Sequence, residues 1–252
     1  MSRLWGEKTY REVATRDRDR IVAILPLGAV EAHGPHLPLV TDGLIAEAMA
    51  AEAARRLETR GLEPMVLPTL DYSAAPFARQ FAGTISVRPD TIAALIRDIG
   101  WSLSSRAACF ALANAHLDPA HLGSLHSAAE ELTDLGLLVA FPDLTLKPWA
   151  LRLTEEFKSG ACHAGCYETS VVLASRPDLV RGAIRRTLAD NPVSLAKAIR
   201  DGKKTFSDAG GPQAYFGAPA AATPGEGRKT ISELGAILED AVLQSLSAGV
   251  AS

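Results

Sequence analysis

Short apolar runs alternate with longer stretches of mixed polarity along the chain. The runs at residues 21–28, 64–67, 107–113 and 137–141 lack the period of two that marks a half-exposed strand. Continuous apolar runs of this length are typical of strands that are buried on both faces. The pattern therefore predicts four central strands.

Helical patterns separate these runs. Residues 44–57 are rich in Ala, Glu and Arg, and residues 89–105 and 119–135 carry apolar side chains at helical spacing. Proline at the start of the latter two suits the first turn of a helix, and a final helix is predicted over about residues 228–246. Strands that alternate with helices predict a single α/β domain over residues 1–252, with a mainly parallel sheet flanked by helices.

One segment does not follow this alternation. Residues 203–229 are rich in Gly, Ala and Pro and show little periodicity. Such a length is unusual for a loop inside a compact domain, so we expect the segment either to serve the function or to pack against another subunit.

Composition and charge exclude several classes of partner. The chain has 252 residues, 47% of them hydrophobic, a net charge of -3 and scattered basic residues, so we expect neither nucleic acid nor a membrane as partner. The N-terminal residues lack the apolar stretch of a signal peptide, and no segment approaches the roughly 18 apolar residues of a membrane span. Three cysteines, an odd number, favour free thiols and a cytoplasmic protein.

The first candidate site follows the first apolar run. Glu31, His33, His36 and Asp42 lie on a loop that Gly and Pro residues keep from forming a regular helix or strand. An extended chain would point residues 31 and 33 in the same direction, and carboxylate with imidazole suits Zn, Mn or Fe. Asp42 could bridge two ions. The alternative is that these are turn and capping residues, with Asp42 as the N-cap of the next helix.

The third apolar run ends in a second candidate site. His116 follows this strand at the sheet edge where the first loop should also lie, and could bind a metal. Asp118 could reach the same space, or could cap the helix that begins at Pro119. We interpret His121 and His126, on that helix, as ordinary surface or packing residues.

A third cluster occupies residues 162–170. His163 and Glu168 supply a proton-transfer group and an anionic ligand. The spacing of Cys162 and Cys166 matches that of zinc ligands only loosely, and no second cysteine pair exists, so we reject a thiolate–metal site. Either thiol could still line a pocket.

These residue types suit metal-assisted hydrolysis. Two neighbouring ions would lower the pKa of a shared water and polarise a substrate carbonyl, and His163 could protonate the leaving nitrogen of an amide. The chain has no Gly-x-Ser-x-Gly nucleophile motif and no Gly-rich phosphate loop, which argues against those chemistries.

The motifs together resemble a known family. Residues 26–42 (PLGAVEAHGPHLPLVTD) resemble the signature of the creatininase (creatinine amidohydrolase) family, and residues 114–116, 163–170 and 217–227 are similar to its later motifs, in the same order. The resemblance implies a creatininase-like three-layer α/β sandwich with a four-stranded parallel sheet, usually assembled as a homohexamer. It also implies a binuclear centre of Zn, Mn or Fe.

The family's functional residues map onto matching positions. The resemblance assigns Glu31 and His116 to one ion and His33 to the other, with Asp42 as the bridge. The last ligand of the second ion is either Glu168 or Asp118, which matches a glutamate of creatininase itself. Glu168 is favoured because its side chain is longer and the motif around it is intact. His163 is implied as the catalytic proton-transfer residue, and Asp118 remains a second catalytic candidate.

The second motif departs from the family pattern. Many members read Asn-Gly-His-Gly-Gly-Asn, whereas residues 114–119 read NAHLDP here, which adds bulk and rigidity beside His116. Creatinine is therefore a doubtful substrate. The leading hypothesis is a metal-dependent amidohydrolase acting on a small cyclic amide, a formamide or a short peptide. The alternatives are a peptidase that matures a precursor peptide and a non-catalytic metal- or ligand-binding relative.

Overall fold

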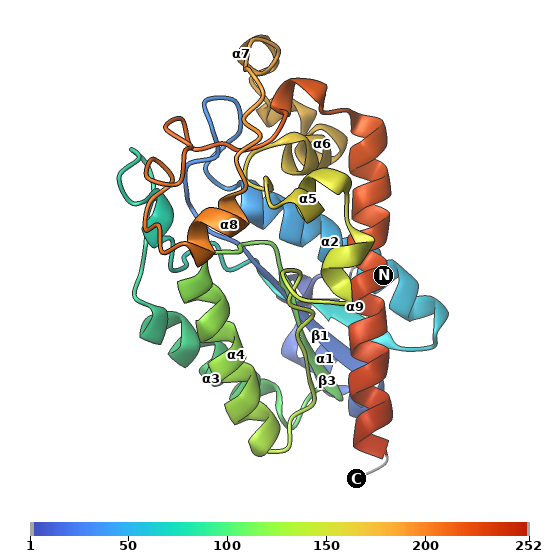
Figure 1. Cartoon of the computed structure of the whole chain (residues 1–252). Helices are drawn as coiled ribbons and strands as arrows, with labels where there is room; N and C mark the ends of the chain where they lie inside the picture. Colours follow the sequence, from blue (N-terminus) through green and yellow to red (C-terminus); the bar gives the residue numbers. More distant parts are fainter. Residues whose placement is uncertain (1–2, 251–252) are drawn as a thin grey trace.

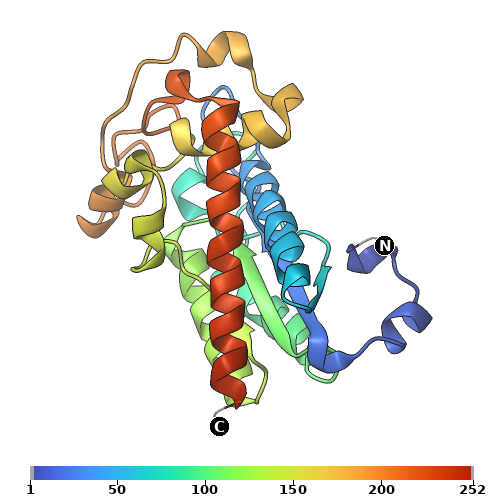
Figure 2. The ribbon, with the colours of Figure 1, turned by 90° about the vertical axis from the view of Figure 1, so that its right-hand side faces the viewer.

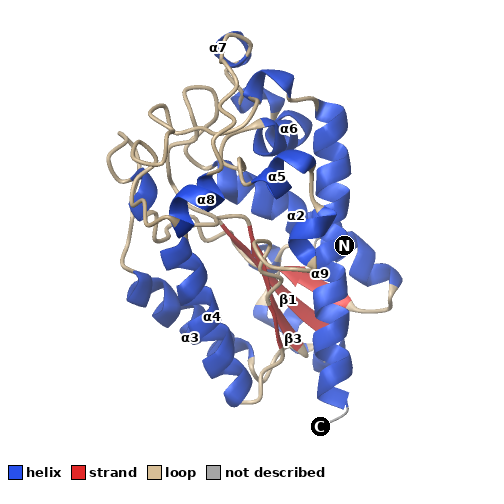
Figure 3. Cartoon of the chain, viewed as in Figure 1, coloured by secondary structure: helices blue, strands red, loops and turns tan. Residues whose placement is uncertain are grey.

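A central parallel sheet organises the structure, a computed structural model that describes residues 3–250. Its strands lie in the order β2-β1-β3-β4 and all pair in parallel. Figure 3 shows the strands, in red, between the helices. They are β1 (Ile21–Leu27), β2 (Glu63–Val66), β3 (Cys109–Asn114) and β4 (Val139–Ala140). The predicted α/β class with a four-stranded parallel sheet is confirmed.

Helices cover both faces of this sheet and complete three layers. In Figure 1, α3 (Pro89–Leu103) and α4 (Pro119–Asp134) lie on one side of the strands, and α9 (Pro224–Val250) lies on the other. Figure 2 shows α9 running beside α2 (Thr41–Thr59), and α6 (Cys166–Ser175) packs against both. The shorter helices are α1 (Tyr10–Ala14), α5 (Glu155–Ser159), α7 (Gly182–Arg185) and α8 (Leu195–Arg200). Within the described residues, no helix combines the length and the apolar character that crossing a membrane requires.

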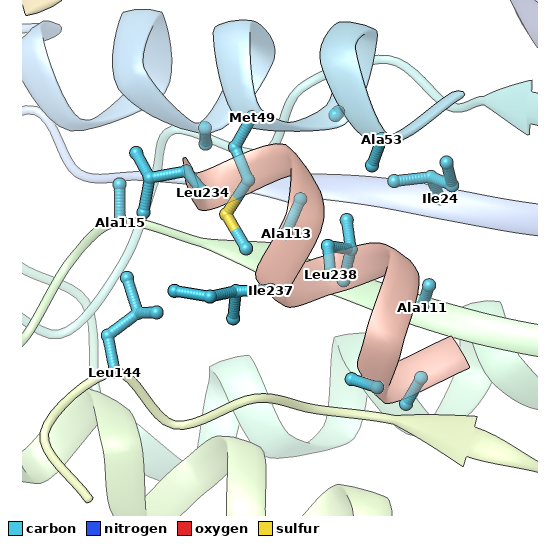
Figure 4. Close-up of a cluster of buried hydrophobic side chains, with 14 of the residues drawn as sticks. Ile24, Met49, Ala53, Ala111, Ala113, Ala115, Leu144, Leu234, Ile237 and Leu238 are labelled. Carbon is cyan, nitrogen blue, oxygen red and sulfur yellow. The ribbon is translucent and has the colours of Figure 1, made fainter. Parts of the chain in front are cut away.

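Two apolar cores explain why the strands show no alternation of polar and apolar residues. Ile24 of β1 faces the core formed with α2 and α9, where Met49 and Ile237 also lie (Figure 4). The neighbouring residue Leu25 faces the core formed with α3 and α4, which contains Ile96. Burying each of these large side chains contributes roughly 1.5–3 kcal/mol, so both faces of the sheet select apolar residues.

The predicted elements differ from the observed ones mainly at their ends. Helix α2 begins at Thr41 rather than residue 44, and α9 extends over Pro224–Val250. Helix α6 was not predicted, because its residues from Cys166 to Val172 are all buried and show no amphipathic period.

Strand register brings the candidate loops to one edge. Leu27 of β1 pairs with Asn114 of β3, so both strands end at the same level. The loop that carries Glu31 and His33 therefore starts beside the loop that carries His116, as expected at the carboxyl ends of parallel strands.

Candidate metal centre

Three carboxylates and three imidazoles converge beyond the carboxyl ends of β1 and β3. All six side chains are buried, with residue exposures between 0% and 7%. Their ligand atoms form three overlapping groups, each with all its atoms within 4.8 Å of one another. The groups are Glu31/Asp42/His116, His33/Asp42/Glu168 and Glu31/His33/His163.

The first group places His116 between two carboxylates. Its Nδ1 lies 3.2 Å from Glu31 Oε1 and 3.0 Å from Asp42 Oδ2. Its Nε2 lies 2.9 Å from the carbonyl oxygen of Ala74, which can accept the ring N–H. A main-chain acceptor of this kind fixes the tautomer and leaves the Nδ1 lone pair for a metal.

The second group is built in the same way around His33. Its Nε2 lies 3.0 Å from Asp42 Oδ1 and 3.6 Å from Glu168 Oε2. Its Nδ1 lies 3.1 Å from the carbonyl oxygen of Glu31, which can accept the N–H. The two oxygens of Asp42 thus face different imidazoles, so this carboxylate could contact two ions.

His163 borders both groups. Its Nε2 lies 2.9 Å from the carbonyl oxygen of Ala32, and its Nδ1 lies 3.8 Å from Glu31 Oε1. The ring packs between His33 and Phe206, with centroid distances of 4.3 and 4.2 Å. Nδ1 therefore faces the centre, where it could either carry a proton or bind an ion.

The charges of the cluster favour cations. Burial by itself disfavours a charged His33, but Asp42 and Glu168 raise its pKa to about 10. Burial raises the pKa of Glu168 to about 8, and burial together with the charge on His33 lowers the pKa of His163 well below its usual value. Glu31 Oε2 is buried and accepts no hydrogen bond from residues 3–250. A buried cluster of carboxylates in which one oxygen has no hydrogen-bond donor is suited to binding divalent cations.

A close approach of two glycines positions Asp42. A Cβ on Gly28 would lie 2.3 Å from the backbone nitrogen of Gly43, so helix α2 starts directly against the end of β1. Asp42 is the second residue of α2, and Val40 occupies the N-cap without a side-chain cap. The alternative interpretation of Asp42 as an N-cap is therefore wrong.

The loop before α6 is held in an unusual conformation. Ala164 has a φ of 53°, and its N–H donates to Glu168 Oε2 at 2.6 Å. Glu156 accepts from the backbone N–H of Tyr167 and of Ala218, each at 2.7 Å. A Cβ on Gly217 would lie 2.1 Å from Glu156 Oε1, so this carboxylate joins the third motif to the C-terminal loop only because that loop has a glycine.

Asp118 lies beside the cluster rather than in it. Its Oδ1 accepts the N–H of Ala120 at 2.8 Å and caps α4, and its Oδ2 accepts the N–H of Phe77 at 3.4 Å. Burial raises its pKa, although the neighbouring His116 acts in the opposite direction. Among the described residues, none of the three ligand groups includes Asp118.

The other residues considered from the sequence are two histidines and the cysteines, and the two histidines make structural contacts. His121 is fully buried, and its ring nitrogens contact Ser73 Oγ and, at 2.8 Å, Asn114 Oδ1, so it packs behind His116. His126 is half-exposed and lies 2.8 Å from Asp143. All three cysteines are free, as predicted, and Cys162 faces the pocket.

A pocket of about 230 Å³ opens onto this candidate centre. Its walls are largely apolar and include Phe77, Phe157 and Phe206, and two cations, Lys158 and Arg200, also line it. These residues were not predicted, since none belongs to a recognisable motif. Phe206 does lie in the segment 203–229, for which a functional role was one of two expectations.

Comparison with known proteins identifies the family. The creatininase family (creatinine amidohydrolase) matches residues 6–242. This chain belongs to the creatininase family. It is 32% identical over 228 residues to a mycofactocin precursor peptide peptidase of Mycobacterium tuberculosis (strain ATCC 25618 / H37Rv), covering 87% of this chain and 82% of that protein. It is 28% identical over 193 residues to a creatinine amidohydrolase of Pseudomonas putida, covering 69% and 72% respectively.

Solved structures agree with this assignment. A structure titled creatininase Mn superposes with a TM-score of 0.74 at 25% identity and covers 97% of this chain and 98% of that one. The three-layer fold predicted from the sequence is thereby confirmed as creatininase-like.

Proposed function

We propose that this creatininase-family protein is a binuclear metal-dependent hydrolase that cleaves a C–N amide bond. One observation carries the proposal: two buried three-ligand groups share Asp42 at the end of an apolar pocket. The first ion would be held by Glu31, Asp42 and His116, and the second by His33, Asp42 and Glu168. Bound ions would supply Lewis acidity, by lowering the pKa of a water and polarising a carbonyl.

The protein's own residues would orient the amide and move its proton. His163, held through Nε2 by the carbonyl of Ala32, would take a proton at Nδ1 and pass it to the leaving nitrogen. Phe206 packs against this ring and limits its rotation. The apolar walls would limit the access of water to a bound amide, which would strengthen the electrostatic interactions around it. Asp118, on the pocket wall, is the second candidate for contact with substrate.

Two substrate classes are compatible with this centre. The volume of about 230 Å³ favours a small amide or one end of a larger molecule. The mycobacterial relatives named mycofactocin precursor peptide peptidases favour a peptide. Activity of the metal-loaded protein across lactams, formamides and short peptides would separate these classes. The absence of turnover on all of them would favour a non-catalytic relative.

The proposal extends to the metals and the assembly. Carboxylate and imidazole ligands suit Zn, Mn or Fe, and a related structure is titled with Mn. By family resemblance we propose a homohexamer, and three free thiols favour the cytoplasm.

Metal removal is expected to abolish hydrolysis. Dialysis against a chelator should stop turnover because the ions supply the activated water, and added Zn or Mn should restore it. Turnover of an amide substrate before and after dialysis measures the effect, with metal content determined in parallel. Full activity in protein shown to be free of metal would exclude the proposal.

The last ligand of the second ion can be identified by metal content. Glu168→Ala should lose one ion per chain, because Glu168 lies 3.6 Å from His33 Nε2. Asp118→Ala should keep both ions, because this carboxylate caps α4 and lies outside the ligand groups. Elemental analysis of the two purified variants makes the comparison. Loss of an ion only from the Asp118 variant would reverse the assignment.

A further inference from the structure

Two cationic side chains line the pocket, whose other charged groups are the carboxylates of the candidate centre and Asp118 and whose remaining walls are mostly apolar. Lys158 lies on α5 and Arg200 is the last residue of α8. The backbone N–H of Ala196, in α8, donates to the carbonyl of Gly160, the C-cap of α5, at 3.2 Å. This hydrogen bond joins the two helices, so both cations are carried by one local structure.

Neither cation is neutralised by a strong internal partner. Arg200 is exposed and forms no hydrogen bond or ion pair with any residue that the structure describes; its charge acts on the adjacent carboxylate of Asp201, which is itself paired with Lys197. Lys158 pairs with Glu155, whose side chain is 91% exposed, and an exposed pair of this kind contributes little. Both charges are therefore available to a ligand.

We propose that the substrate carries a carboxylate and an apolar group beside its scissile amide, with Arg200 as the main contact of the carboxylate and Lys158 as a second one. This inference rests on the proposed amide hydrolysis and names its substrate class. A guanidinium can donate two parallel hydrogen bonds to a carboxylate. The apolar walls of Phe77, Phe157 and Phe206 would receive the apolar group.

The arrangement also disfavours other substrates. A cationic group at this position would be repelled by Arg200 and Lys158, and a neutral amide would form no ion pair with either. Two positive charges on the pocket wall would in addition raise the local concentration of anionic substrates. An acyl amino acid or the C-terminal end of a peptide has the required chemistry.

A matched pair of probes tests the proposal. N-acetyl-L-phenylalanine carries the carboxylate, and N-acetyl-L-phenylalaninamide is its neutral counterpart; hydrolysis of the acetyl amide releases acetate from both. In the metal-loaded protein, we expect a higher kcat/KM for the acid. Arg200→Gln should lower kcat/KM for the acid by about 5- to 10-fold and leave the neutral probe nearly unchanged.

Lys204→Gln provides the control. Lys204 lies four residues after Arg200, is exposed and carries the same charge, but it does not line the pocket. Its substitution should leave the ratio of the two probes unchanged. Equal losses for both probes in Arg200→Gln, or an equal change of the ratio in Lys204→Gln, would overturn the proposal. Thermal unfolding of each variant verifies that it is folded.

Binding separates this inference from the proposed hydrolysis. Calorimetric Kd values of both probes are measured on the metal-loaded His163→Ala variant, which is expected to turn over slowly and to keep the ions that would offset the carboxylates of the centre. We expect the acid to bind more tightly than the amide and Arg200→Gln to remove most of that difference. If the metal-loaded protein releases no acetate while this binding difference is present, the hydrolysis of these probes fails and the carboxylate subsite stands. Equal Kd values, or binding of neither probe, would exclude the subsite.

Discussion

Asp42→Asn is expected to lose metal from both sites and to lower kcat/KM by more than about 100-fold. Loss of an outer partner of a metal ligand already lowers affinity or activity by roughly 10- to 100-fold, and Asp42 would contact both ions directly. Its Oδ1 faces His33 and its Oδ2 faces His116. An asparagine keeps the shape but replaces one of these anionic oxygens with a donor NH₂ group.

Elemental analysis and steady-state kinetics of the same preparation measure this effect. Asp143→Asn is a matched control, because Asp143 is also a buried aspartate that pairs with a histidine, His126, but it belongs to none of the ligand groups. The control should keep its metal. Two ions per chain in Asp42→Asn would show that this carboxylate is not the bridge.

His163→Ala is expected to keep its metal content and to lower kcat by about 10²- to 10⁴-fold, the range for loss of a general acid–base group. The imidazole faces the centre through Nδ1 but lies 3.8 Å from Glu31 Oε1, farther than the distances that join His33 and His116 to Asp42. Proton transfer, rather than metal retention, should therefore suffer most.

The half-exposed His126 supplies the control, since His126→Ala removes an imidazole that pairs with Asp143 and belongs to none of the ligand groups. The pH profile of kcat should lose one limb in His163→Ala and stay unchanged in His126→Ala. If His163→Ala instead lost one ion per chain, the residue would be a ligand and the proton would need another carrier.

Much of the fold could be predicted from local patterns. The buried runs at β1 and β3 are apolar on both faces, which is a direct consequence of being covered by helices on both sides. Pro89 and Pro119 marked the starts of α3 and α4. Helix α6 could not be recognised, because a helix that is buried on all sides has no polar face to reveal its period.

The sequence by itself determined the chemical types at the candidate site. Glu31, His33 and His116 directly follow buried parallel strands, and such strands end at one edge of the sheet. Their convergence therefore follows from chain order together with the fold class. Family resemblance added the expected bridging role of Asp42 and the expected preference for Glu168.

Only the tertiary structure decided how these groups face one another and what surrounds them. The close approach of Gly28 and Gly43 sets Asp42 between two imidazoles, and the hydrogen bonds of Asp118 hold it at the start of α4. Phe206 and Arg200 reach the pocket from segments distant in the chain. Side-chain direction and pocket shape depend on contacts between such distant segments, and a local pattern of polar and apolar residues carries no record of those contacts.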